Sequence, residues 1–194
     1  MVFIIGIQSV GCNNEDKRNK TSEIKVDNSF FRIQIKRTDG SYYNLGEAEK
    51  MTASVFIFLN PECPICQSYS STLNNLFEKF RGHAVMFYGI FPGKYYNQEQ
   101  IEKYISDYKI QFSTLNDPDL KMVKALNAKI TPEVFVLYNS NKIAYHGCID
   151  NSNYSLGKHR TVVTEHYLND VLDNIIHDQS ISVKDNEAIG CIIE

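Results

Sequence analysis

The stretch SVFIFLNPECPICQSY, residues 54–69, decides the fold. Its opening SVFIFL is an apolar run of strand length, rich in β-branched and aromatic side chains, which indicates a buried central strand. The run leads directly into Cys63 and Cys66, which are separated by a proline and an isoleucine. After Cys66 the apolar residues recur at helical spacing, and Gly82 supplies a stop. The stretch therefore predicts a strand, a Cys-x-x-Cys motif and a helix, in that order.

This placement gives the two thiols different chemistry. Free backbone N–H groups and the helix dipole stabilise negative charge at the start of a helix, so we expect the pKa of Cys63 to lie well below that of free cysteine. Cys63 is then the exposed attacking thiol, and Cys66 is the more buried resolving thiol. Pro64 restricts the backbone and fits the first turn of a helix without an N–H partner. The spacing lets both sulfurs meet in a redox-active Cys63–Cys66 disulfide, so the site requires no bound cofactor.

The remaining patterns predict a mixed sheet with helices on both faces. Strands are expected in a hairpin around Asp39-Gly40, in AVMFYGIF at 84–91, and in a terminal hairpin made of EVFVLY (133–138) and KIAYHG (142–147). Helices are expected after the capping pair Asn97 and Gln100, from Asp117-Pro118 through Leu126, and from Thr164 onwards. No internal repeat or domain boundary interrupts residues 29–178, so this range is expected to form one domain.

A Thr-Pro pair enters the strand EVFVLY at Thr131 and Pro132. A proline at the entry to a central strand favours a special turn with a cis peptide bond. A strand, a Cys-x-x-Cys motif and a helix, followed later by Thr-Pro and a β-hairpin, resemble the thioredoxin superfamily over residues 29–178. The resemblance implies an α/β thioredoxin-like fold whose central mixed β-sheet is flanked by helices, here with an extra N-terminal β-hairpin. It also implies that the cis-proline loop packs against the disulfide and binds the partner peptide, which makes Thr131, Pro132 and Pro64 the expected substrate-binding residues.

Three fragments of the sequence more closely resemble redoxin-domain proteins related to alkyl hydroperoxide reductase and thiol-specific antioxidant. The fragments are FLNPECPICQSY (58–69), TPEVFVLYNSNKIAYHGCID (131–150) and AIGC (188–191). The peroxiredoxin branch of that group requires Pro-x-x-x-Thr-x-x-Cys. Counted from Cys63, the proline and threonine places hold Phe56 and Asn60, and counted from Cys66 they hold Leu59 and Cys63. Thiol–disulfide exchange with partner proteins is therefore expected in preference to thiol peroxidase activity.

Two metal-binding interpretations stay open beside the redox one. Half of a structural zinc site has the same Cys-x-x-Cys spacing, and His146 with Cys148, or Cys191, would have to supply its other ligands. A soft thiolate pair also suits Cu(I), as in the Sco copper carriers, which resemble this fold. Those carriers use Cys-x-x-x-Cys and a distant histidine, whose part His159 or His166 would have to take here. The prediction for the domain is that it holds no metal.

The chain has five cysteines, and an odd number argues against a disulfide scaffold. Cys148 is predicted to be an inert buried thiol within a strand. Cys191 lies in the C-terminal tail, residues 179–194, whose apolar end suggests docking onto the domain. Cys191 is a candidate third redox thiol, which would meet Cys63 or pair with Cys148. A purely structural role and an exposed stray thiol are equally open.

The amino end, MVFIIGIQSVGC at residues 1–12, is a short apolar run that ends in a cysteine. It resembles a bacterial lipoprotein signal, which implies a lipid on Cys12 and a polar tether over residues 13–28. No lysine or arginine precedes the run, and a mildly apolar terminus with a stray cysteine is the alternative. On the lipoprotein interpretation, the protein is anchored in the bacterial cell envelope, periplasm-facing or at the outer membrane, and it meets the membrane only through the lipid on Cys12.

The charge of the chain limits the classes of molecule that it is expected to bind. The 194 residues carry a formal net charge of −3 and no basic run, so nothing supports binding to nucleic acid. Partners are expected to be the thiols and disulfides of other proteins, and the protein itself is expected to be a monomer.

Overall fold

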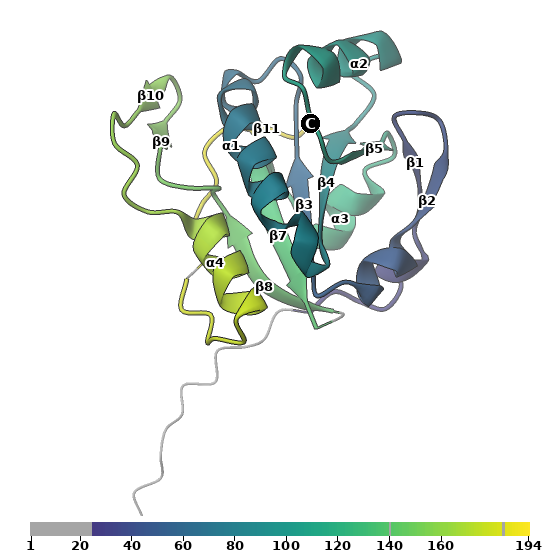
Figure 1. Ribbon diagram of the computed structural model, residues 1–194. Coiled ribbons are helices and arrows are strands. Elements are labelled where there is room, and N and C mark those ends of the chain that lie inside the picture. Colours follow the sequence, from purple (N-terminus) through teal and green to yellow (C-terminus); the bar gives the residue numbers. More distant parts are fainter. Residues whose placement is uncertain (1–24, 140, 184) are drawn as a thin grey trace, which may run out of the picture.

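The computed structural model describes residues 25–139, 141–183 and 185–194, which form a sheet covered by helices on both faces (Figure 1). The predicted signal and Cys12 lie outside the described residues, as does most of the predicted tether. The part of the tether that is described already contacts the domain. Val26 is buried, and its N–H donates to the carbonyl oxygen of Asn141 at 2.9 Å. No helix in the described ranges is long and apolar enough to cross a membrane.

The central sheet has seven strands in the order β2-β1-β5-β4-β3-β7-β8. They are β1 (Gln34–Arg37), β2 (Tyr42–Asn44), β3 (Ala53–Phe58), β4 (Val85–Pro92), β5 (Ser113–Asp117), β7 (Glu133–Tyr138) and β8 (Lys142–Gly147). Strands β3, β4 and β5 run parallel, and the other neighbours pair antiparallel, so the sheet is mixed as predicted. The carboxyl ends of the three parallel strands meet at one edge of the sheet, and the candidate site is built there.

The helices form one layer on each face of the sheet (Figure 1). One core cluster joins α1 (Pro64–Phe80), α2 (Gln98–Asp107) and α4 (Tyr167–Ile176) to the sheet, and the other joins α3 (Lys121–Leu126) and the 3₁₀ helices η1 (Phe30–Arg32) and η2 (Leu45–Lys50). A further 3₁₀ turn, η3 (Arg81–His83), follows α1. In β3, Val55 and Ile57 face the α1 side, and Phe56 and Phe58 face the α3 side. Burial on both faces is why this strand is apolar at consecutive positions.

Four short strands were not predicted. β9 (Asn153–Ser155) pairs with β10 (Lys158–His159), and β6 (Ile130–Thr131) pairs antiparallel with β11 (Cys191–Ile192). The second pair matters for the site, because it ties the C-terminal tail to the segment that contains the Thr-Pro pair. The peptide bond between Thr131 and Pro132 is cis, which confirms the prediction of a special turn.

The region around Asp117 corrects the predicted element order. Strand β5 was not predicted, and Asp117 is its last residue. Helix α3 begins at Lys121 rather than at Pro118, because residues 118–120 form a turn that ends with Leu120 in the left-handed region. The N-cap residue is therefore Leu120 and not Asp117 as predicted, but the Asp117 carboxylate still accepts hydrogen bonds from the N–H groups at the start of α3.

Helix α4 also begins later than predicted, at Tyr167 instead of Thr164. The N–H groups of Thr164 and Glu165 donate to the side-chain oxygen of Asn151, at 3.1 and 3.3 Å. These bonds hold the two residues in the preceding loop. The helix predicted from Thr164 is therefore longer at its N-terminal end than the helix that forms.

Candidate active site

The loop between β3 and α1 is organised by Asn60. Its side-chain oxygen accepts the N–H of Glu62 at 2.8 Å, and its carbonyl oxygen accepts the N–H of Cys63 at 3.1 Å. Cys63 is consequently the N-cap residue of α1, and Pro64 is the first residue in the helix, as predicted. Glu62, which precedes Cys63, is exposed.

Cys66 is the third residue of α1 and is fully buried. The N–H of Asn60 donates to its Sγ at 3.4 Å. The carbonyl oxygen of Cys66 accepts hydrogen bonds from the hydroxyls of Ser70 and Tyr104, at 3.1 and 3.2 Å. These contacts fix the first turn of α1, and with it the position of the second sulfur behind the first.

The pKa values of the two thiols move in opposite directions. A hydrogen bond from Cys66, together with one from Cys191 and backbone N–H groups of the first helical turn, lowers the pKa of Cys63 to about 5. Burial raises the pKa of Cys66 well above that of free cysteine. At neutral pH Cys63 is therefore a thiolate and Cys66 is a protonated thiol. The low pKa of Cys63 and the burial of Cys66 agree with the expectations from the sequence.

The cis Thr131–Pro132 bond lies directly beside the first thiol. The carbonyl oxygen of Thr131 is 3.3 Å from the Sγ of Cys63, and both residues are 1% exposed. The fold thus brings together Cys63, Cys66, Pro64 and the Thr-Pro pair, although the last is far away in sequence. The predicted positions form one cluster.

The prediction that Cys63 is exposed is wrong, because the C-terminal tail covers it. Strand β11 pairs with β6 so that Cys191 lies opposite Thr131. The Sγ of Cys191 is 2.9 Å from the Sγ of Cys63 and donates a hydrogen bond to it. Burial and the neighbouring Cys63 thiolate raise the pKa of Cys191 to about 11. The sequence left open whether Cys191 lies beside Cys63 or beside Cys148, and in the structure it lies beside Cys63.

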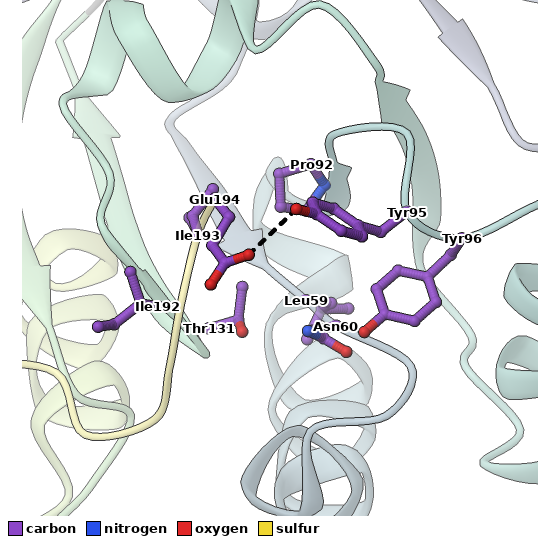
Figure 2. A pocket seen from close by; sticks show the side chains of 9 residues that line it. All are labelled: Leu59, Asn60, Pro92, Tyr95, Tyr96, Thr131, Ile192, Ile193 and Glu194. Carbon is purple, nitrogen blue, oxygen red and sulfur yellow. Dashed lines mark hydrogen bonds between the residues drawn. The ribbon is translucent and has the colours of Figure 1, made fainter.

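A pocket of about 230 Å³ opens beside this cluster at the carboxyl edge of β3 and β4 (Figure 2). It is lined by Leu59, Asn60, Pro92, Tyr95, Tyr96, Thr131, Ile192, Ile193 and Glu194. The hydroxyl of Tyr95 donates to a carboxylate oxygen of Glu194 at 3.1 Å, so the end of the tail forms one wall and the two tyrosines form another. Sequence reasoning missed the tyrosines, and the only available signal was an adjacent aromatic pair just after a predicted buried strand.

The other sulfur and histidine candidates lie apart from the cluster. Cys148 follows β8 instead of lying within a strand, is half-buried, and donates from Sγ to the carbonyl oxygen of Glu187 at 3.0 Å. Burial raises its pKa. His159 in β10 and His166 before α4 are exposed. Within the described ranges, no group of three or more His, Cys, Asp or Glu side chains is arranged to hold a metal ion.

Comparison with known families agrees with this geometry. The model of the AhpC/TSA family matches residues 26–146, which is more than half of the chain. The chain belongs to the AhpC/TSA family. The match spans β3, Cys63, Cys66 and the cis-proline segment, so this AhpC/TSA family member is a thiol-based redox protein of the redoxin group. No curated protein matches its sequence closely enough to count as a relative.

Solved structures share the thioredoxin-like fold of this AhpC/TSA family member at low identity. A hypothetical protein from Sinorhizobium meliloti 1021 is 20% identical, with a TM-score of 0.75 over 83% of this chain and 89% of that one. An uncharacterised conserved protein from Geobacillus kaustophilus is 21% identical, with a TM-score of 0.75 over 88% and 95%. A secreted Mycobacterium tuberculosis disulfide oxidoreductase homologous to E. coli DsbE is 16% identical, with a TM-score of 0.59 over 76% and 98%. At these identities the likeness shows the fold alone.

Proposed function

We propose that this protein exchanges disulfides with partner proteins through Cys63 and Cys66. The observation that carries the proposal is the position of the Cys63 sulfur, at the start of α1 and 3.3 Å from the carbonyl oxygen of Thr131. A low-pKa thiol next to a buried, protonated second thiol is the arrangement that thiol–disulfide exchange requires. The M. tuberculosis protein described as a disulfide oxidoreductase has the same fold, which adds support by analogy.

The reaction has two balanced steps. The Cys63 thiolate attacks one sulfur of a partner disulfide, and the other partner sulfur leaves as a thiolate and takes up a proton. Cys66 then loses its proton and attacks the Cys63 sulfur, which expels the second partner sulfur. The partner gains two electrons and leaves as a dithiol, and the protein retains a Cys63–Cys66 disulfide. Run in reverse, the same steps oxidise a partner dithiol.

Burial of Cys66 keeps these steps in order. Its raised pKa holds it protonated while Cys63 is free, so it does not compete for the partner disulfide. Once Cys63 is in a mixed disulfide, its negative charge is gone, and the repulsion that helped to raise the pKa of Cys66 is removed. Cys66 then ionises more easily, at the stage when its attack is needed.

Thiol peroxidase activity is the second candidate, because the AhpC/TSA family model also covers this site. The residues argue against it, since Phe56 and Asn60 occupy the places where the peroxiredoxin motif has proline and threonine relative to Cys63. Phe56 lies in the middle of β3 and faces the α3 side of the sheet, away from the thiols. It therefore contributes nothing to a peroxide pocket at Cys63.

The test is a redox titration of the metal-free full-length protein in graded thiol–disulfide buffers, with free thiols trapped and each cysteine mapped by mass. The expected result is one two-electron transition that oxidises Cys63 and produces the Cys63–Cys66 disulfide. A Cys66→Ser variant is expected to accumulate the mixed disulfide with a disulfide-bonded model protein, because the resolving thiol is missing. Consumption of hydrogen peroxide without exchange with that protein would favour the peroxidase, and stoichiometric retention of added Cu(I) without turnover would favour a copper carrier.

A further inference from the structure

The last ten residues, 185–194, form a segment that we call the tail strap, and both of its ends are bound to the domain. At its start, Asp185 and Asn186 contact the end of β8. The N–H of His146 donates to the Asp185 carboxylate at 2.9 Å, and the N–H of Cys148 donates to the Asn186 side-chain oxygen at 2.8 Å. The strap is therefore anchored before it reaches the thiols.

At its far end the strap is an extended strand on the cis-proline segment. β11 pairs antiparallel with β6, and the N–H of Ile193 donates to the carbonyl oxygen of Lys129 at 2.8 Å. Cys191 and Ile193 pack against the two core clusters, while Ile192 between them is 72% exposed. This alternation is that of a peptide laid on a sheet edge, with every second side chain directed into the protein.

Two glycines permit the close approach of the strap. A Cβ on Gly190 would lie 2.0 Å from the carbonyl oxygen of Thr131, and a Cβ on Gly147 would lie 2.3 Å from the carbonyl oxygen of Asn186. Neither position accepts a side chain while the strap is bound. One glycine belongs to the strap and the other to the domain, so the surfaces on both sides are shaped for this contact.

We propose that the tail strap is a tethered substrate mimic, which excludes partner proteins from β6 and whose Cys191 exchanges reversibly with the Cys63–Cys66 disulfide. This inference rests on the proposed function, because it assigns Cys191 the position of the reacting cysteine of a partner. A partner peptide that pairs with β6 and presents a sulfur to Cys63 needs the space that the strap fills. Strap and partner therefore exclude one another.

The exchange is an isomerisation and needs no outside oxidant. With Cys63 and Cys66 joined, the Cys191 thiol loses its proton and attacks the Cys63 sulfur. The Cys63–Cys66 bond breaks, a Cys63–Cys191 bond forms, and the proton is taken up by the Cys66 thiolate that leaves. One disulfide and one thiol are present before and after the step, so no electrons are gained or lost.

Geometry favours this step over exchange with a distant thiol. The two sulfurs lie 2.9 Å apart, and an S–S bond is about 2.05 Å long, so they need to approach by less than about 1 Å. The strap already holds Cys191 in place through the β6 pairing. When Cys63 is in a disulfide its negative charge is absent, so the repulsion that helps to raise the pKa of Cys191 disappears. The oxidised site is the state in which Cys191 reacts most easily.

The test compares full-length Gly190→Ala with Gly82→Ala. The first change places a methyl group against Thr131 and displaces the strap, whereas a Cβ at Gly82 meets no atom within 4 Å. In the reduced proteins we measure the rate at which iodoacetamide alkylates Cys63. Gly190→Ala is expected to react about tenfold faster than wild type, the factor that corresponds to the loss of one or two backbone hydrogen bonds. Gly82→Ala is expected to match wild type.

The second measurement maps the disulfide in protein that contains one S–S bond among the three thiols, after quenching in acid. Wild type is expected to contain both the Cys63–Cys66 and the Cys63–Cys191 isomers, and Gly190→Ala is expected to lose most of the second. An absent Cys63–Cys191 isomer in wild type, or an alkylation rate that Gly190→Ala leaves unchanged, overturns the inference. Failure of Cys63 to form any disulfide in either protein instead overturns the proposed function itself.

A Cys191→Ser variant distinguishes the covering of Cys63 by the strap from disulfide exchange by Cys191. Serine preserves the backbone pairing with β6, so alkylation of Cys63 is expected to stay slow, within about twofold of wild type, while the Cys63–Cys191 isomer is lost. Fast alkylation in this variant would mean that the sulfur contact, and not the strand pairing, holds the strap in place. That result would overturn the substrate-mimic inference.

Discussion

The sulfur atoms of Cys63 and Cys191 lie 2.9 Å apart, although 128 positions separate the two residues in the sequence. The contact depends on two short strands, β6 and β11, which place Cys191 opposite Thr131. It leaves the reactive thiol only 1% exposed and contributes to its low pKa, because Cys191 donates a hydrogen bond to the thiolate. The tail therefore limits access to Cys63 and also contributes to the low pKa of its thiol.

Replacing Cys66 by alanine is expected to raise the pKa of Cys63. The hydrogen bond from Cys66 is the largest contribution that lowers the Cys63 pKa to about 5. Its loss should raise the midpoint of thiolate formation by at least about one pH unit. The measurement is the ultraviolet absorbance of the thiolate as the reduced protein is titrated. Cys66 and Cys191 have raised pKa values, so the first step in that titration belongs to Cys63.

Cys66→Ser is the matched control for this prediction. A serine hydroxyl keeps a donor at the same place, so the midpoint should stay closer to that of wild type than the alanine midpoint does. Equal midpoints in wild type and Cys66→Ala would mean that the backbone N–H groups of α1 lower the pKa of Cys63 without help from Cys66.

The stability of the reduced protein is expected to rise with pH between about 5 and 9. The pKa of Cys63 is about 5 in the folded protein and about 9.0 when free, so in this interval the folded state holds a thiolate and the unfolded state a thiol. The unfolded state then binds one more proton, and the free energy of unfolding increases with pH by up to about 1.4 kcal/mol per unit. This contribution is fully present above pH 9 and is lost as the pH falls through 5.

Urea denaturation at a series of pH values in the presence of a phosphine reductant measures this dependence. Cys63→Ser lacks the ionising group, so its stability should be flatter across the same interval. Cys66 and Cys191 stay protonated in the folded protein because their pKa values are raised there, and in the unfolded chain they ionise only near the pKa of free cysteine. Below about pH 8 they therefore add little slope, and the comparison between the two proteins is made there. Identical slopes in the two proteins would contradict a folded Cys63 thiolate.

The strand–Cys-x-x-Cys–helix arrangement was predictable because its signals are local. The apolar run of β3, the proline at the first helical position and the helical spacing after Cys66 all lie within residues 54–82. The cis bond before Pro132 was predictable for the same reason, since a proline at the entry to a central strand has few other solutions. These signals also located the main cluster of candidate site residues.

What the sequence did not reveal depends on contacts between distant segments. β5 holds polar residues at Asn116 and Asp117, and it is recognised as a strand only through its pairing with β4 and β1. The partner of Cys191 was equally hidden, because two-residue strands such as β6 and β11 have no period to detect. The burial of Cys63 was mispredicted as a result. Gly190 permits the close approach of the tail to Thr131, but the sequence alone does not show that these two residues are neighbours.

Asp117→Ala is expected to lower the free energy of unfolding by about 0.5–2 kcal/mol, the usual loss for removing an N-terminal cap. The carboxylate of Asp117 accepts the N–H groups of Lys121, Met122 and Val123 at 2.7, 2.9 and 3.1 Å. Alanine leaves these donors without a partner at the start of α3. Urea denaturation measures the loss. Asp119→Ala is the control, since Asp119 is exposed and its ion pair with Lys94 contributes little.

Asn186→Ala is expected to loosen the tail strap at the end that is remote from the thiols. The Asn186 side-chain oxygen accepts the N–H of Cys148 at 2.8 Å and the hydroxyl of Tyr145 at 3.2 Å. Loss of these two hydrogen bonds should speed hydrogen exchange of the Ile193 amide about tenfold, because that N–H is protected only while it donates to Lys129.

The control for the strap is Gln179→Ala, an exposed position in the segment that leads into it. Its exchange at Ile193 should equal that of wild type. If Asn186→Ala leaves the Ile193 amide as protected as before, the β6–β11 pairing holds without the anchor, and the strap would open by fraying from its C-terminal end alone. If protection falls as expected, the strap leaves β6 as a unit, which is the motion that a partner needs in order to reach Cys63.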